Sequence, residues 1–144
     1  CKLGYRVKRV LETSRIICNG ELDLEALRQV DYEKAKLELL SLPGVGHKVA
    51  ECVLLFSLGK LQAFPVDVWM KKIILEFYPE FFTQLFIENV SKRSSLTDRE
   101  YEKISNFGKD YFGFYAGYAQ EYLYHWKRLE SNIKKENKGA HVRV

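Results

Sequence analysis

The chain has 144 residues, of which 47% are hydrophobic and 14% aromatic. This composition predicts one packed globular domain and excludes a disordered chain. The formal net charge of +4 arises in the segment 127–144, which holds six Lys or Arg residues and two Glu residues, so the rest of the chain is neutral. A nucleic-acid surface would therefore need local basic clusters, such as those at 2–15 and 71–72, and a solvated helix face is the simpler explanation of either cluster.

The three cysteines form no CxxC pair and no metal-ligand spacing. This pattern predicts reduced thiols, an intracellular protein and no cysteine-bound cluster. No apolar run approaches the roughly 20 residues of a membrane span, and the basic start is unlike a signal peptide. We expect a location in the cytoplasm, nucleoid or nucleus, depending on the organism, and no membrane partner. The first residue is not Met and lies inside an expected helix, so we expect a piece of a longer polypeptide.

The first part of the chain predicts three helices. Apolar residues at positions 7, 10, 11, 17 and 18 favour an amphipathic helix over residues 5–18. Asn19 and Gly20 suit a left-handed helix end. Asp23 and Asp31 are expected to cap two short helices, the second of which leads into a glycine-rich turn.

The stretch LPGVGHKVAECVLLF, residues 42–56, predicts a tight turn followed by a new helix. Pro43, Gly44 and Gly46 break the preceding helix, and the ten residues after them are mostly helix formers. The turn would leave backbone N–H groups pointing outward at a helix N-terminus, where they suit a phosphate oxygen. The glycines alone fit a plain helix-helix turn equally well.

Lys48 and Asp67 are the candidates for chemistry near this turn. Lys48 lies in the first turn of the new helix, where the macrodipole disfavours an ammonium group. That placement costs stability but leaves more of the neutral amine, which is the nucleophile. Asp67 follows Pro65 and begins the helix VWMKKIILEF. A phosphate-contacting surface lysine and a helix N-cap remain the simpler interpretations of Lys48 and Asp67.

The second half of the chain predicts further helices and no strands. We predict a helix over residues 67–78, which Pro79 ends, and another buried helix over residues 81–90. Thr97 and Glu100 predict the capping box of a helix over 98–112. The last helix, about 114–129, carries a stripe that we interpret as core: Tyr115, Tyr118, Ala119, Tyr122, Trp126 and Leu129. We therefore predict an all-α, multi-helix fold.

Two helix faces are candidates for holding a flat heterocycle. The face after the turn carries Lys48, Cys52 and Phe56. The face of the last helix opposite the aromatic stripe carries Gly117, Gln120 and Tyr124. On it the glycine permits close approach, the amide can donate and accept, and the ring can stack. Ordinary core on the first helix and a solvent-facing polar side on the last remain the simpler interpretations.

These motifs together resemble the helix-hairpin-helix DNA glycosylases with a Gly-Pro-Asp signature. The resemblance rests on the turn with its following helix and on PVDV at 65–68. Lys48 is similar to the lysine of the members that have lyase activity. Two further motifs narrow the resemblance to the 8-oxoguanine DNA glycosylase/AP lyases. They are LGYR at 3–6 and YAGYAQ at 115–120, which is similar to the family's YAGWAQ. The resemblance extends to about residue 127 and implies that the family's amino-terminal part is missing. It implies a helical catalytic domain at 1–130 and a basic tail, expected to be flexible, at 131–144.

The resemblance implies a role for each matching residue. Lys48 is implied to attack C1′ of the damaged nucleoside and form a Schiff base, and Asp67 to stabilise the positive charge that develops on the sugar. Cys52 and Tyr124 are implied to sandwich the flipped base, and Gln120 to read its edge. Phe56, from its spacing on the helix, completes the residues that we expect to bind the base. The implied DNA-contacting residues are Tyr5, Arg6, Gly44, Gly46 and His47.

The implied activity is removal of 8-oxoguanine followed by β-elimination, and the implied substrate is double-stranded DNA with an oxidised purine, bound by a monomer. We expect no cofactor, metal ion or iron-sulfur cluster, apart from a monovalent cation on the hairpin carbonyls. Trp69 stands where many relatives have His, and Phe114 replaces the usual Pro before YAG. These departures put a DNA contact at residue 69 and the start of the last helix in doubt. The alternatives are a glycosylase for another damaged base and a non-catalytic helix-hairpin-helix module.

Overall fold

The computed structural model describes residues 3–140, and within that range it consists of helices and connecting loops without strands. The first helices are η1 (Gly4–Arg6), α1 (Val7–Cys18), α2 (Ala26–Gln29), α3 (Tyr32–Leu40) and α4 (His47–Phe56). The later ones are α5 (Val68–Phe77), η2 (Pro79–Phe81), α6 (Gln84–Ser91), α7 (Asp98–Phe112), η3 (Gly113–Tyr115) and α8 (Ala116–Ala140). The all-α prediction is confirmed.

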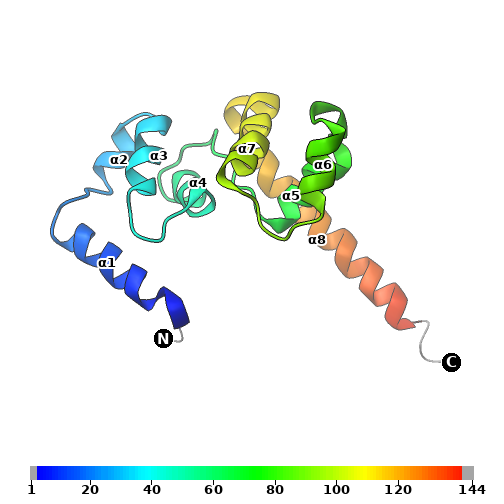
Figure 1. Cartoon of the computed structure of the whole chain (residues 1–144), viewed down its shortest axis with the longest axis horizontal. Helices are drawn as coiled ribbons and strands as arrows, with labels where there is room; N and C mark the ends of the chain where they lie inside the picture. The colour runs from blue at the N-terminus through cyan, green and yellow to red at the C-terminus, as the bar shows by residue number, and fades with distance from the viewer. Residues whose placement is uncertain (1–2, 141–144) are drawn as a thin grey trace.

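The helices form two neighbouring groups, each with a core of its own (Figure 1). One core is built from buried residues between positions 22 and 63, and the other from buried residues between positions 64 and 116. The chain passes from one core to the other at Ala63 and Phe64, which are both fully buried. The segment that carries Asp67 therefore lies where the two groups meet.

Side-chain caps begin α3, α5 and α7 where the sequence predicted them, whereas α2 has Glu25 as its N-cap without a side-chain cap bond, so the predicted N-cap at Asp23 is wrong. The carboxylates of Asp31 and Asp67 each accept a hydrogen bond from the backbone N–H three residues further on, at 2.8 and 2.7 Å. Thr97 and Glu100 form the predicted capping box of α7. Gly20 follows α1 with a φ of 75°, in the left-handed region. These caps satisfy backbone groups that a helix leaves unpaired at its ends.

The aromatic stripe of α8 is exposed, so the prediction that it forms core is wrong. Its large exposed members are Tyr115, Tyr118, Tyr122, Trp126 and Leu129. The opposite face packs instead, with Gly117 and Gln120 buried. The N–H of Gly117 donates to the carbonyl of Leu61 at 2.8 Å, and a Cβ at residue 117 would lie 2.1 Å from Cδ1 of Leu55. The face that carries Gly117 and Gln120 therefore packs closely, and the aromatic face is directed outward.

Two other boundaries differ from the predictions. α8 continues past the expected end near residue 129 to Ala140, so residues 131–140 of the expected tail are helical, and residues 141–144 lie outside the described residues. The expected buried helix at 81–90 becomes η2 and α6, and within α6 only Val90 is buried. Within the described residues, no helix has both the length and the apolar character that a membrane span requires.

Candidate active site

The turn between α3 and α4 has the backbone geometry that its glycines predicted. Gly44 has a φ of 82°, and a Cβ there would lie 2.5 Å from Cδ of Arg9 on α1. The carbonyl of Pro43 accepts a hydrogen bond from the hydroxyl of Thr13, also on α1, at 3.0 Å. Gly46 is the extended N-cap of α4, so the first N–H groups of α4 have no acceptor within the helix. The turn is thus fixed against α1 and presents a helix N-terminus suited to an anion.

Lys48 and Asp67 line the same cavities from different elements. Lys48 is exposed in the first turn of α4, and Asp67 is half-buried at the start of α5. Both line two adjoining cavities of about 190 Å³ each, one of them toward α8 and the other toward α7. The predicted N-cap role of Asp67 is confirmed. A carboxylate has more acceptor positions than one cap uses, so capping leaves capacity for a second contact.

The cavity toward α8, which we call the Lys48 cleft, gathers all six residues predicted for catalysis and base binding. Its lining consists of Lys48, Cys52, Phe56, Pro65, Asp67, Gln120, Glu121 and Tyr124. The contributors on α4 are spaced four residues apart, as are Gln120 and Tyr124 on α8, so each helix presents its set on one face. The structure thus brings residues from distant parts of the sequence to one cleft.

The wall of the cleft at Cys52 is neutral. Burial raises the pKa of the Cys52 thiol; the positive charge of Lys48 opposes this effect, and the carboxylates of Asp67 and Glu121 reinforce it. The thiol therefore stays protonated at pH 7 and behaves as a small, soft apolar group. Phe56, one turn further along α4, is 61% exposed. An ordinary core position would bury this ring, so the core interpretation of Phe56 is wrong.

Gln120 is the buried polar group of the cleft. Its side chain is 5% exposed, and within the described part of the chain its Oε1 atom has no hydrogen-bond partner. A buried polar atom left without a partner costs about 1–3 kcal/mol. This acceptor belongs to a residue that lines the cleft, and an N–H donor on a bound molecule is the kind of group that would satisfy it.

Three of the residues predicted to contact DNA line a separate groove of about 490 Å³ between α1 and the turn. They are Tyr5, Arg6 and Gly44. The Tyr5 ring is 77% exposed, and the guanidinium carbon of Arg6 lies 4.6 Å from its centroid. An exposed aromatic ring beside a cation can stack on a nucleobase and attract a phosphate. Gly46 is also exposed, at the start of α4.

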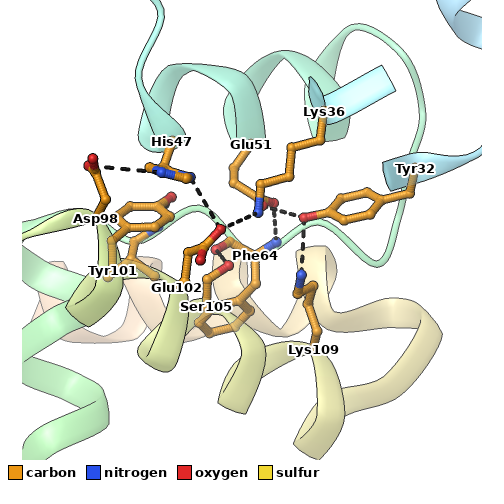
Figure 2. Close-up of polar contacts among 11 residues, drawn as sticks. Tyr32, Lys36, His47, Glu51, Phe64, Asp98, Tyr101, Glu102, Ser105 and Lys109 are labelled. Carbon is orange, nitrogen blue, oxygen red and sulfur yellow. Dashed lines mark hydrogen bonds and ion pairs between the residues drawn. The ribbon is translucent and has the colours of Figure 1, made fainter. Parts of the chain in front are cut away.

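His47 is directed toward α7 and lines neither the Lys48 cleft nor the groove. Its ring stacks on Tyr101 with 5.5 Å between centroids. Its ring nitrogens lie 3.8 Å from a carboxylate oxygen of Asp98 and 3.7 Å from one of Glu102 (Figure 2). Contact of the imidazole with DNA stays a prediction that this orientation does not favour, because α7 covers the side chain.

Sequence reasoning missed three charged residues near the cleft. Glu121 lines it beside Gln120, and Glu51 is fully buried on α4. A lone charge in the apolar run VAECVLLF was the available signal for Glu51, because a buried carboxylate requires partners. Lys71, expected on a basic surface, is 5% exposed, and its amine donates to the carbonyls of Val90 and Arg93.

Comparisons with known proteins identify similar chains. The chain is 34% identical over 140 residues to the probable N-glycosylase/DNA lyase of Methanothermobacter thermautotrophicus, covering 97% of this chain and 39% of that protein. It is 32% identical over 125 residues to N-glycosylase/DNA lyase OGG1 of Arabidopsis thaliana, covering 84% of this chain and 32% of that protein.

A solved structure has the same fold. The 8-oxoguanine glycosylase/lyase of Clostridium acetobutylicum, in complex with double-stranded DNA containing cytosine opposite 8-oxoG, superposes with a TM-score of 0.74 at 34% identity. The match covers 91% of this chain and 40% of that one. This chain therefore spans about two fifths or less of the length of these relatives. No family model matches it.

Proposed function

This chain belongs to the 8-oxoguanine type of helix-hairpin-helix DNA glycosylases, and we propose that it carries the catalytic part of a bifunctional 8-oxoguanine DNA glycosylase and AP lyase. The proposed substrate is duplex DNA with an oxidised purine, bound by a monomer. The Lys48 cleft carries the proposal, because its lining combines an amine, a carboxylate, a neutral wall and an amide whose oxygen has no partner among the described residues. A module that only binds phosphates does not need this combination of groups.

Base recognition follows from the walls of the cleft. A base inside a duplex is out of reach, so it must be flipped out of the stack at a cost of a few kcal/mol. Cys52 on α4 and Tyr124 on α8 line the cleft from its two helices and would hold the flat ring between them. The Oε1 atom of Gln120 would accept a hydrogen bond from an N–H on the edge of the base. Stacking and edge contact would together offset the cost of flipping.

The chemistry is assigned to Lys48 and Asp67. The Lys48 amine bonds to C1′ as the glycosidic bond breaks, and the departing base takes the electron pair of that bond and the proton that the amine releases. The Asp67 carboxylate stabilises the positive charge that develops on the sugar. The amine adduct then opens to an imine, and β-elimination through the imine expels the 3′ phosphate. One lysine thereby serves both the glycosylase and the lyase step.

The turn and the groove would hold the DNA around the flipped nucleotide. The N-terminus of α4 suits a backbone phosphate, and Tyr5 with Arg6 would occupy the space left by the flipped base. A monovalent cation on the hairpin carbonyls belongs to the proposal, because backbone oxygens are the ligands that hard cations prefer. The carbonyls of Leu42 and Pro43 already accept one hydrogen bond each, and a carbonyl oxygen has a second lone pair.

The proposal is tested by trapping the imine. The intact protein that carries this sequence is incubated with a duplex containing one 8-oxoguanine in the presence of borohydride. We expect the wild type to release the base and form a covalent protein–DNA complex, and Lys48→Gln to form none. Lys34→Gln, which changes an exposed lysine on α3, is the matched control and should trap normally. Trapping by Lys48→Gln at the wild-type level would contradict the role of Lys48.

The same assay separates the alternatives. A glycosylase for another lesion would excise a different base from a panel of damaged duplexes and leave 8-oxoguanine in place. A non-catalytic module would bind damaged and undamaged duplexes alike, with strong dependence on salt, and would give no covalent complex.

A further inference from the structure

We propose that Glu51 is a positioning residue, which sets the Asp67 carboxylate relative to the Lys48 amine. It would act by fixing the segment Phe64–Asp67, which we call the junction segment, against α4. Glu51 does not line the Lys48 cleft, so it acts through other groups. The inference rests on the proposed function, because it concerns the same cleft.

The first observation is the set of contacts that Glu51 makes. Its side chain is fully buried, three residues after Lys48 on α4. One carboxylate oxygen accepts a hydrogen bond from the backbone N–H of Phe64 at 3.1 Å. The other accepts from the hydroxyl of Tyr32 and lies 3.1 Å from the amine of Lys36 (Figure 2). The helix that carries Lys48 is thus bonded directly to the segment that carries Asp67.

The second observation is that α7 holds the same segment from its other side. The hydroxyl of Ser105 donates to the carbonyl of Phe64 at 3.0 Å, and the hydroxyl of Tyr101 accepts from the N–H of Val66 at 3.0 Å. A Cβ on Gly108 would lie 2.4 Å from the Phe64 ring, so the ring is also held by close packing. The backbone is therefore bonded from α4 and α7 at the residues immediately before Asp67.

The third observation is that the Glu51 carboxylate is paired although it is fully buried. A buried charge is stabilising only when it is well paired, and a packed apolar group is often as good for stability alone. Glu51 has its pair in Lys36, which is 7% exposed and also lies 3.8 Å from Glu102. What an apolar residue cannot supply is an acceptor for the N–H of Phe64, which lies outside any helix. The carboxylate therefore has a directional role in addition to its packing.

A double-mutant cycle tests the proposal in the intact protein. We expect Glu51→Ala to lower the single-turnover rate of 8-oxoguanine excision about 100-fold, the size of effect that a misplacement of about 1 Å produces. The Kd for the duplex should change little. In the Asp67→Asn background the same substitution should lower the rate no further, because a residue that acts through Asp67 has nothing left to position.

Two variants separate positioning from stability. Glu51→Gln keeps an oxygen for the N–H of Phe64 and should retain most of the excision rate. Tyr32→Phe removes a hydrogen bond from the same carboxylate without touching the junction segment. It should lower the midpoint of thermal unfolding and leave excision unchanged at temperatures where every variant is folded. The proposal would be overturned if Tyr32→Phe lost as much excision rate as Glu51→Ala. It would also be overturned if the losses in excision rate of Glu51→Ala and Asp67→Asn multiplied in the double mutant.

A second route covers the case in which Glu51→Ala does not fold. Tyr101→Phe removes the acceptor for the N–H of Val66 while keeping the ring, and it should give the same loss of excision, absent in the Asp67→Asn background. Multiplying effects in this cycle would equally overturn the proposal. A wild-type protein that excises no 8-oxoguanine would instead refute the proposed function, so the two failures are distinguishable.

Discussion

Gln120 combines two properties that rarely coincide, since its side chain is almost fully buried and its oxygen has no partner within the described residues. A residue selected for stability alone would pair or lose such an atom. Its place in the wall of the Lys48 cleft supplies a reason to keep it, because a bound base would satisfy the oxygen. At the scale of one residue, recognition and stability are therefore expected to oppose each other.

The substitution Gln120→Leu tests this opposition. Leucine has a similar size and no polar atom that burial would leave without a partner, so we expect the free energy of unfolding to rise by up to about 1–3 kcal/mol. The excision rate for 8-oxoguanine should fall about 10- to 100-fold, which is the loss of one hydrogen bond to the base. Chemical denaturation and single-turnover excision measure the two effects. A variant that is both less stable and less active would show that the amide serves packing.

At the scale of the element, α8 decides the shape of the cleft. Its residue Gly117 approaches Leu55 and the carbonyls of Leu61 and Ala63, which brings Gln120 and Tyr124 to the wall opposite α4. The aromatic stripe remains outside. Periodicity identifies a stripe on a helix but gives no rule for which of two opposite stripes packs. Here the close approach of α8 to the loop at Leu61 and Ala63 decides which stripe packs. That loop is distant from α8 in the sequence.

A pair of substitutions on α8 tests which face packs. Gly117→Ala places a Cβ 2.1 Å from a side-chain carbon of Leu55, so we expect a loss of about 1–3 kcal/mol in the free energy of unfolding. Excision should fall as well, because α8 must move away from α4. Tyr122→Ala, at a site that is 77% exposed, should change stability by no more than about 0.5 kcal/mol. A loss of about 3–5 kcal/mol in Tyr122→Ala would instead be that of a buried aromatic residue.

At the scale of the whole molecule, the cleft lies where the two helix groups meet. Lys48 and Cys52 belong to α4, in the group around the first core, whereas Asp67 and Gln120 belong to the group around the second. The buried network around Glu51 joins the groups beside this cleft (Figure 2). The relative position of the catalytic pair therefore depends on the packing of the molecule as a whole, and not on either helix alone.

Local signals were sufficient for the turn and for most of the caps, whereas the prediction of the residues in the cleft depended also on the family resemblance. Gly44, Asp67 and Thr97 each act within a few residues of their own position, and helical spacing together with the family resemblance named Gln120 and Tyr124. The orientation of His47 toward α7 and the burial of Glu51 depend on contacts between elements far apart in the sequence. Their partners are fixed only when the two helix groups pack, so no local pattern could predict them.

The most direct test of the central claim is to locate the covalent bond in the trapped complex. The complex with the 8-oxoguanine duplex is reduced with borohydride and digested with protease and nuclease, and the modified peptide is sequenced by mass spectrometry. The Lys48 cleft predicts one sugar adduct, on the Nζ atom of Lys48. An adduct on another lysine or on the terminal amine, with Lys48 unmodified, would contradict the assignment of this cleft as the active site.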